Sequence, residues 1–319
     1  MAVRIGLIGA GSMGSLHARV IATNPATELA WIADPDETVG KAVADRYSSR
    51  WVAEPLTSGV DAVVVASPTQ FHFEHALQII GSGIPLLVEK PLADKYAESV
   101  SIVEAADAHG VALMCGLLER FNPAVRTALE IAKETLHVAT TRHSPYADRI
   151  RTGVASDLLI HDVDVVIRLF NAEPSGVSGH YGYFEPRSGA TSEDVAECTM
   201  RFSGGQIAVL SVSRIAQHKV RTLTISELGR VIEVDLLRQV ITVYRNVQGA
   251  GYDEEAGYSQ QTIIDIPVIR HSGEPLQLQL AHFLALIDGR GDEAAERETL
   301  LAPHRVLHAI ATAASDASG

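Results

Sequence analysis

The sequence predicts an α/β fold with a doubly wound parallel sheet, followed by an α+β domain with a large, mostly antiparallel open sheet. Apolar runs alternate with helical periodicity up to about residue 120, which is typical of βαβ units. From Leu136 onward, short strand-like segments follow one another, with turn signals such as Ser203-Gly204-Gly205 between them. A chain of 319 residues is long enough for two domains, which we expect at residues 1–120 and 121–319.

The first domain is expected to contain five parallel strands with helices between them. The predicted strands are Val3–Ile8, Leu29–Ala33, Asp61–Ala66, Leu86–Glu89 and Val111–Cys115. A helical pattern follows the first strand through Ile21, and further helices are expected over about 36–47, 70–80 and 94–109.

The second domain is expected to be an open sheet crossed by one helix, over about 155–170. Its predicted strands are His137–His143, Ser178–Phe184, Ala196–Phe202, Gln206–Ser213, Arg221–Ser226, Val231–Val234 and Val240–Tyr244. Two amphipathic helices, near 276–287 and 302–314, close the chain and can pack back on the first domain. The polar stretches 248–261 and 288–298 are interpreted as surface loops.

Composition and charge argue against several classes of partner. A formal charge of −13 and a pI near 5.4 disfavour nucleic acid and anionic membranes, because both need a basic face. The sequence has no apolar run of 18 residues, and its apolar N-terminus is accounted for by the first strand, so neither a membrane span nor a signal peptide is expected. Cys115 and Cys198 have no metal-ligand spacing, so we expect reduced thiols in a cytoplasmic protein.

The segment Gly9-Ala10-Gly11-Ser12-Met13-Gly14 joins the first strand to the first helix, which is the setting of a Rossmann dinucleotide-binding turn. In such a turn Gly9 permits the tight bend, Gly11 lets the backbone approach the pyrophosphate, and Gly14 lets the helix pack on the strand. The N–H groups at the helix N-terminus then face the anion. The alternative is a glycine-rich turn that binds no cofactor.

Asp34 ends the second predicted strand about 20 residues after Gly14, which is the offset of the acid that binds a ribose 2′-hydroxyl. A carboxylate there would repel a 2′-phosphate, and Pro35 and Asp36 bring no cation. The predicted cofactor is therefore NAD rather than NADP.

Two more segments at the carboxyl ends of predicted strands are candidates for cofactor contacts, because doubly wound sheets bind ligands at that edge. The first consists of Ser67, Pro68, Thr69 and His72. Its alternative role is to cap the next helix. The second is Glu89-Lys90-Pro91, where Lys90 is also a candidate catalytic and substrate-binding cation. The alternative for Lys90 is a surface lysine that ends a strand.

Asp157 and His161 are spaced i, i+4 in the helix predicted over 155–170, so they share one of its faces. A carboxylate beside an imidazole orients the ring, which suits a general acid/base pair. Both are candidate catalytic and substrate-binding residues. One alternative is a helix-start carboxylate with a half-buried histidine; another is a metal site that would add Asp164 but lacks a distant fourth ligand. We predict no metal.

The segment 141–151 is locally basic within an acidic chain. It is a candidate clamp for a phosphate or carboxylate, and a solvated basic loop is the alternative. With neighbours in sequence, the predicted substrate contacts are Arg120, Asn122, His143, Tyr146, Arg149 and Arg151.

These motifs together resemble the Gfo/Idh/MocA family of sugar and polyol oxidoreductases over nearly the whole chain. The resemblance rests on the glycine turn, the loop from Ser67 to His72, Glu89-Lys90-Pro91 and the spacing of Asp157 and His161. It implies that Lys90 and His161 handle a proton and that Asp157 holds the histidine or a sugar hydroxyl. It also implies a cis peptide bond before Pro91.

Within that family, the stretches 118–125 and 149–164 are most similar to the UDP-N-acetylglucosamine 3-dehydrogenase group, beside inositol dehydrogenase-like members. The family's glycine run before the catalytic helix is reduced here to Gly153. This difference concerns the substrate pocket more than the chemistry.

The resemblance implies an NAD-dependent dehydrogenase that transfers hydride between the nicotinamide and a secondary hydroxyl of a sugar, nucleotide sugar or polyol. One alternative is a non-catalytic NAD(P)-responsive binding or regulatory protein of the same fold. A metal-dependent hydrolase or lyase is another. An open sheet with an exposed face predicts a homodimer or homotetramer.

Overall fold

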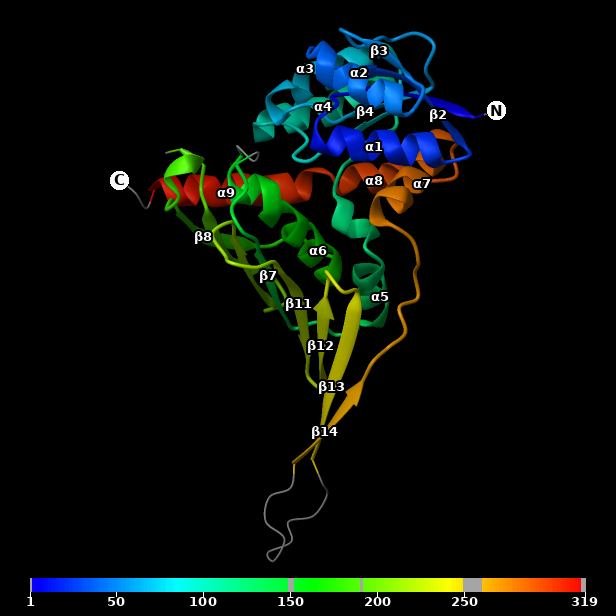
Figure 1. The fold of residues 1–319 in the computed structure, drawn as a ribbon. Coiled ribbons are helices and arrows are strands. Elements are labelled where there is room, and N and C mark those ends of the chain that lie inside the picture. The colour runs from blue at the N-terminus through cyan, green and yellow to red at the C-terminus, as the bar shows by residue number, and fades with distance from the viewer. Residues whose placement is uncertain (1, 149–151, 190–191, 249–259, 317–319) are drawn as a thin grey trace, which may run out of the picture. The chain divides into compact units, whose positions relative to one another are not determined.

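The computed structural model describes residues 2–148, 152–189, 192–248 and 260–316. The chain forms two compact units, which are coloured by residue number in Figure 1. Unit 1 contains Met1–Leu118 and Glu274–Arg305, and unit 2 contains Glu119–Gly273 and Val306–Gly319. Unit 1 is therefore built from two separate stretches of the chain.

Unit 1 is built on a six-stranded parallel sheet in the order β3-β2-β1-β4-β5-β6, which confirms the predicted doubly wound sheet. Its strands are β1 (Val3–Ile8), β2 (Thr27–Ala33), β3 (Arg50–Val52), β4 (Ala62–Val65), β5 (Leu86–Val88) and β6 (Leu113–Cys115). The sequence analysis did not predict the short edge strand β3. The strand order reverses between β1 and β4, and ligands of such sheets bind beyond the carboxyl ends of the strands at this point.

The helices of unit 1 pack on this sheet. They are α1 (Ser12–Thr23), α2 (Glu37–Arg46), the short η1 (Thr69–Phe71), α3 (His72–Gly81), α4 (Tyr96–His109), α7 (Pro275–Ile287), α8 (Glu293–Glu298) and the start of α9 (Leu301–Asp316). Helices α1 and α7 lie side by side, as do α3 and α4 (Figure 1). The expectation of a loop over 288–298 is wrong, because α8 lies there, capped by Asp292, which accepts from the Ala295 N–H at 3.0 Å.

Unit 2 contains an eight-stranded sheet in the order β14-β13-β12-β11-β7-β10-β9-β8. Every neighbouring pair is antiparallel except β7 and β10, so the predicted mostly antiparallel sheet is confirmed. Its strands are β7 (His137–His143), β8 (Gly176–Gly182), β9 (Val195–Arg201), β10 (Ile207–Ser213), β11 (Val220–Glu227), β12 (Arg230–Asp235), β13 (Val240–Gln248) and β14 (Gln260–Asp265). Strand β14 was not predicted.

The expectation of a single helix on this sheet is wrong, because α5 (Pro123–Ile131) packs on β12 and β13. Asn122 caps α5 and Pro123 opens it, which are ordinary helix-start signals. The helix predicted over 155–170 has two parts: a π-helical turn, η3 (Ala155–Leu159), and the α-helix α6 (Ile160–Phe170). The Ile160 N–H donates to the Ala155 carbonyl, which is the i to i+5 bond of a π-helix. The remaining short helices are η2 (Leu118–Phe121) and η4 (Pro186–Ser188).

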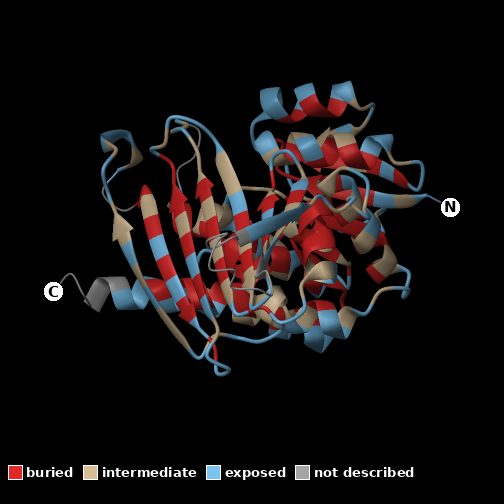
Figure 2. Cartoon of the chain, turned by 90° about the horizontal axis from the view of Figure 1, so that it is seen from below, coloured by how far each residue is buried: buried red, intermediate tan, exposed pale blue. Residues whose placement is uncertain are grey.

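The two faces of the unit 2 sheet differ in burial, and Figure 2 shows buried and exposed residues alternating along its strands. In β7, Val138, Thr140 and Arg142 are buried, whereas the residues between them are half-exposed. Because η3 and α6 pack on β10 beside β7, the buried set faces the helices. His143 therefore belongs to the opposite, open face.

Candidate functional site

The glycine turn after β1 has the geometry of a dinucleotide-binding turn. Gly9 has φ +96°, and a Cβ there would lie 2.6 Å from the Ala66 carbonyl oxygen. A Cβ on Gly14 would lie 1.9 Å from the Gly9 carbonyl oxygen, so α1 packs closely on the turn. A Cβ on Gly11 would meet no described atom of the chain within 4 Å. The space above Gly11 therefore fits a ligand that approaches the backbone.

The N-terminus of α1 is suited to an anion. Its first turn, Ser12-Met13-Gly14, carries no acidic side chain, and its cap Gly11 offers no side chain to the first N–H groups. Backbone N–H groups and the helix dipole at such an end favour a phosphate.

Asp34 lies directly beside this turn. Its Oδ2 accepts from the Ala10 N–H at 2.7 Å, and its Oδ1 accepts from the Asp36 N–H at 2.9 Å. These two bonds fix a half-buried carboxylate at the carboxyl end of β2. Each oxygen has a second lone pair, so the carboxylate can also accept from the two hydroxyls of a ribose.

The loop after β4 is fixed through two histidines. The Ser67 hydroxyl lies 3.1 Å from Nδ1 of His75, and Nε2 of His72 lies 2.8 Å from the Ser67 carbonyl oxygen. Pro68 is exposed, and Thr69 begins η1. Within the described part of the chain, no side chain caps the start of η1 or of α3, so the capping role is not seen here, and the loop stays a candidate for cofactor contacts at the carboxyl edge of the sheet.

Glu89 and Lys90 follow β5, and the Lys90-Pro91 peptide bond is cis. Lys90 is half-buried, whereas Glu89 is buried and its Oε1 lies 2.8 Å from Nε2 of His17 in α1. Burial alone would raise the pKa of Glu89, but the hydrogen bond to His17 and the charge of Lys90 outweigh it and hold the pKa below its ordinary value. Glu89 is thus an internal ion-pair partner immediately before Lys90.

In unit 2, Asp157 lies in η3 and His161 in the first turn of α6, and both are half-buried. The π-helical turn corrects the expectation of one regular helix, and such turns are frequent at functional sites. The neighbouring Asp162 and Asp164 are buried instead. Asp157 and His161 are therefore partly accessible to solvent, whereas Asp162 and Asp164 are not.

Glu193 fixes the start of this helix, which the sequence analysis did not anticipate. Its Oε1 accepts from the Ala155 N–H at 2.8 Å, and its carbonyl accepts from the Val154 N–H at 3.1 Å. A Cβ on Gly153 would lie 1.9 Å from the Glu193 carboxylate, so any other residue there would push this carboxylate out of its position. This contact accounts for the one glycine kept before the helix.

The buried acids of α6 pair with arginines. Arg142 donates to Asp162 through Nη2 at 2.7 Å and to Glu119 through Nη1 at 2.9 Å. Burial would lower the pKa of Arg142, but these two carboxylates hold it above its ordinary value. Arg120 makes a bidentate pair with Asp164, at 2.7 and 2.8 Å.

The structure places the predicted substrate contacts in several different surroundings. Arg120 and Asn122 are buried, and Asn122 caps α5 while its amide donates to Glu119 at 3.0 Å. His143 lies on the open face, 2.9 Å from the Ser211 hydroxyl. Tyr146 is half-buried with the Arg187 guanidinium 4.3 Å from its ring centre. Arg149 and Arg151 lie outside the described residues.

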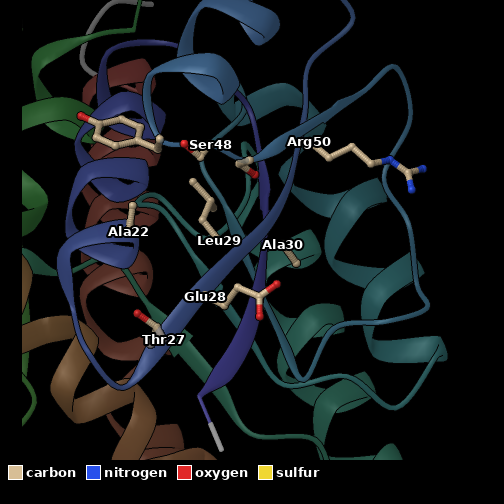
Figure 3. Close-up of a pocket in the computed structure, with 9 residues that line it drawn as sticks. Ala22, Thr27, Glu28, Leu29, Ala30, Ser48 and Arg50 are labelled. Carbon is tan, nitrogen blue, oxygen red and sulfur yellow. The ribbon is translucent and has the colours of Figure 1, made fainter.

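Unit 1 also has a pocket of about 510 Å³, which Figure 3 shows from the side of α1 and β2. It is lined by Thr27 and Glu28 at the start of β2 and by Ser48, Ser49 and Arg50 at the start of β3. These are the amino ends of the strands, the edge opposite to the glycine turn. The pocket is therefore separate from the candidate cofactor site.

The described residues contain neither a candidate membrane span nor a candidate metal cluster. In those ranges no helix combines the length and apolar character needed to cross a bilayer. The same ranges contain no group of three His, Cys, Asp or Glu side chains arranged to hold a metal ion.

Comparison with known proteins gives matches over both units. A family model described as the oxidoreductase family with an NAD-binding Rossmann fold matches residues 3–117. The GFO/IDH/MocA C-terminal domain matches residues 134–231.

Individual relatives cover most of the chain. A UDP-N-acetylglucosamine 3-dehydrogenase of Acidithiobacillus ferrooxidans is 28% identical over 253 residues, 78% of each chain. An inositol 2-dehydrogenase of Paenarthrobacter aurescens is 32% identical over 252 residues, 72% of this chain and 74% of its own. A scyllo-inositol 2-dehydrogenase (NAD(+)) of Bacillus subtilis is 28% identical over 271 residues, 79% of each chain.

Solved structures share the fold over nearly the full length. The structure of the Acidithiobacillus ferrooxidans enzyme aligns with a TM-score of 0.81 at 26% identity, covering 98% of this chain and 99% of its own. The fold also matches that of GenD2 from gentamicin A biosynthesis, solved in complex with NAD, with a TM-score of 0.82 at 23% identity over 99% of this chain and 95% of its own.

Proposed function

Because this chain belongs to the Gfo/Idh/MocA family of oxidoreductases, we propose that it is an NAD-dependent dehydrogenase acting on a secondary hydroxyl of a sugar, nucleotide sugar or polyol. The observation that carries this proposal is the presence, in one chain, of a dinucleotide turn at Gly9–Gly14, a half-buried Asp157 on a π-helical turn and a half-buried His161 in the helix that follows it. The names of the relatives support the substrate class.

The residues of the turn fit NAD. The space above Gly11 and the N–H groups that open α1 suit the pyrophosphate, and the Asp34 carboxylate suits an adenosine ribose. Ser67, Pro68, Thr69 and His72 stay candidates for further contacts at this edge of the sheet. NAD, when bound, supplies the hydride acceptor at nicotinamide C4.

The proposed chemistry assigns one role to each of three residues. His161 accepts the proton of the substrate hydroxyl as general base, an effect worth about 10²–10⁴-fold in rate. Asp157 holds the imidazole in orientation, since a neighbouring carboxylate fixes the ring and its tautomer. The Lys90 ammonium stabilises the negative charge that develops on the same oxygen.

For the substrate we propose a nucleotide sugar of the UDP-N-acetylglucosamine type, oxidised at C3. The Acidithiobacillus ferrooxidans relative, with 26% identity over 98% of this chain, supports this choice. Arg149 and Arg151 are proposed to bind its diphosphate, because arginine forks match phosphate oxygens. Tyr146, which precedes them in the same segment, stays a candidate contact.

The test is NADH formation, followed by absorbance, from NAD+ with UDP-N-acetylglucosamine, N-acetylglucosamine and myo-inositol. The wild type is expected to turn over, with kcat/KM highest for the UDP-sugar. Lys90→Met should abolish turnover while the Kd for NAD stays within about threefold, because the turn that we assign to the cofactor is untouched. NAD binding without NADH formation from any of these compounds would favour the regulatory alternative.

We further propose that the open face of the unit 2 sheet associates with a second copy of the chain. It carries the half-exposed apolar side chains of Ile207 and Val209, which are 43% and 40% exposed, beside the polar chain from His143 through Ser211 to Glu197. In a symmetric dimer, the same surface patch on each of the two copies forms the interface. Val209→Arg should lower the mass measured by light scattering to that of a monomer, and an unchanged mass would contradict the proposal.

A further inference from the structure

Three buried histidines, from three different elements of unit 1, form hydrogen bonds with the segment Glu89-Lys90-Pro91-Leu92. His17 of α1, His72 of α3 and His304 of α9 are 4%, 1% and 4% exposed. They bond the Glu89 carboxylate at 2.8 Å, the Pro91 carbonyl at 2.9 Å and the Leu92 N–H at 2.8 Å, respectively. The Lys90 N–H lies 3.2 Å from Glu89 Oε2, so the carboxylate that His17 bonds also contacts the Lys90 backbone.

His304 meets the segment as an acceptor. Its Nδ1 lies 2.7 Å from the carbonyl oxygen of Leu300, one turn earlier in the chain, so Nδ1 carries the hydrogen and donates it. Nε2 is then the unprotonated nitrogen, and it accepts the Leu92 N–H at 2.8 Å. This pairing assigns the neutral Nδ1–H tautomer to His304 and connects the start of α9 to the segment that contains Lys90.

His72 meets the segment as a donor. Its two nitrogens lie 2.9 Å from the Pro91 carbonyl and 2.8 Å from the Ser67 carbonyl. A neutral ring has one N–H for these two acceptors, and a protonated ring has two. A protonated His72 therefore donates to both carbonyls and ties the loop after β4 to the loop after β5, whereas a neutral His72 donates to one of them.

His17 holds the side chain of Glu89 rather than the backbone. The contact between Nε2 and Oε1 is 2.8 Å, and both side chains are nearly inaccessible, at 5% and 8% exposed. A Cβ on Gly116 would lie 2.7 Å from the Glu89 carboxylate, so this carboxylate occupies space that a side chain at the neighbouring strand end would otherwise fill. Glu89 in turn accepts from the Lys90 N–H.

We infer that His17, His72 and His304 are positioning residues that fix the backbone on both sides of Lys90 and so set where its ammonium acts. The inference rests on the proposed function, which assigns Lys90 its role. A fixed backbone matters because a displacement of about 1 Å in a reacting group can lower a rate about 10²-fold. None of the three histidines is assigned contact with substrate or cofactor in this role.

His304 offers the sharpest test, because it bonds this segment through the Leu92 backbone N–H. His304→Leu removes the acceptor and keeps an apolar side chain of similar bulk, whereas His304→Gln keeps an acceptor near the position of Nε2. His109→Leu is the matched control: its Nδ1 also bonds the carbonyl one turn earlier, Ala105, at 2.9 Å, but its side chain is exposed.

Two measurements decide the inference. The first is amide hydrogen exchange by mass spectrometry over the peptide containing Leu92, which needs no turnover. The second is kcat with saturating substrate, alongside the Kd for NAD.

We expect His304→Leu to speed exchange of the Leu92 amide at least tenfold and to lower kcat about 10- to 100-fold. The Kd for NAD should stay within about threefold, and His304→Gln should recover most of both losses. His109→Leu should change neither. Losses in Leu92 protection and in kcat that glutamine restores, with an unchanged Kd for NAD, indicate positioning. A general loss of stability would not be selectively repaired by glutamine at this position.

Unchanged exchange at Leu92 in His304→Leu would overturn the inference whatever the activity. Faster exchange with an unchanged kcat would overturn the positioning role as well. A wild type that forms no NADH with any substrate would overturn the proposed function instead, and the exchange data would then describe the fold alone.

Discussion

Replacing Asp34 with serine should remove most of the discrimination against NADP. The carboxylate is a negative charge fixed by two backbone N–H groups, from Ala10 at 2.7 Å and Asp36 at 2.9 Å. At a separation of about 4 Å and an effective dielectric constant of about 20, one pair of like unit charges repels by about 4 kcal/mol. That energy corresponds to about a thousandfold in affinity for a 2′-phosphate.

The serine variant loses contacts to NAD at the same time. One or two hydrogen bonds to a charged group contribute about 1.5–3 kcal/mol each, so kcat/KM for NAD should fall about tenfold or more. The ratio of kcat/KM for NAD to that for NADP should therefore fall by about 10³–10⁴-fold. The assay is steady-state NAD(P)H formation with one substrate at fixed ionic strength, because salt screens the repulsion.

Asp36→Ser is the matched control. Asp36 is also acidic and lies two residues away, but its Oδ1 accepts from the Thr38 and Val39 N–H groups at the start of α2. Serine keeps that cap, so the cofactor ratio should move less than about threefold. The reasoning would be refuted by an unchanged ratio in Asp34→Ser, or by an equal change in both variants.

Three changes test the arrangement around α6. Gly153→Ala forces a Cβ to within 1.9 Å of the Glu193 carboxylate, so kcat should fall at least about tenfold in the NADH assay as the helix start shifts. Burial raises the pKa of Glu193, so its contribution to stability is present at acid pH and is lost as the pH rises through that raised value. Glu193→Gln keeps the acceptor for Ala155 and should flatten the fall in Tm that begins as the pH rises above the ordinary pKa of a glutamate. Arg142→Met leaves Asp162 without its cation and should cost about 3–5 kcal/mol at neutral pH, and less where the carboxyl is protonated. That loss is measured by denaturant unfolding followed by circular dichroism, because both tryptophans lie in unit 1.

The sheet architecture and the glycine turn could be predicted because their determinants are local in the sequence. A run of apolar residues, a glycine pattern and an acid about 20 residues later together define one βαβ unit. The bond from the Ala10 N–H to Asp34 shows the turn and the acid side by side. The elements that escaped prediction are short or polar. Strand β3 has three residues, and α8 (Glu293–Glu298) is polar on every side, with little apolar periodicity to reveal it.

The contacts that fix the candidate catalytic residues could not be predicted, because they join distant parts of the chain. His304 reaches Leu92 across 212 positions, and Glu193 reaches Ala155 across 38. Neither histidine nor glutamate carries a local signal of its partner. The same limit applies to Arg120, whose bidentate pairing with Asp164 across 44 positions makes it an interior residue despite its charge.

The buried ion pairs of unit 2 include those of two arginines, Arg142 of the basic segment 141–151 and Arg120. Asp162 and Asp164 lie two residues apart on α6 and pair with arginines from β7 and η2, respectively. A helix that packs only through apolar side chains could shift slightly along its axis. A shift of α6 would separate its buried ion pairs, at a cost of several kcal/mol for each broken pair. The helix register is thereby restricted, and with it the positions of Asp157 and His161. In this unit Arg142 and Arg120 therefore serve the proposed catalytic pair indirectly, by holding the helix that carries it.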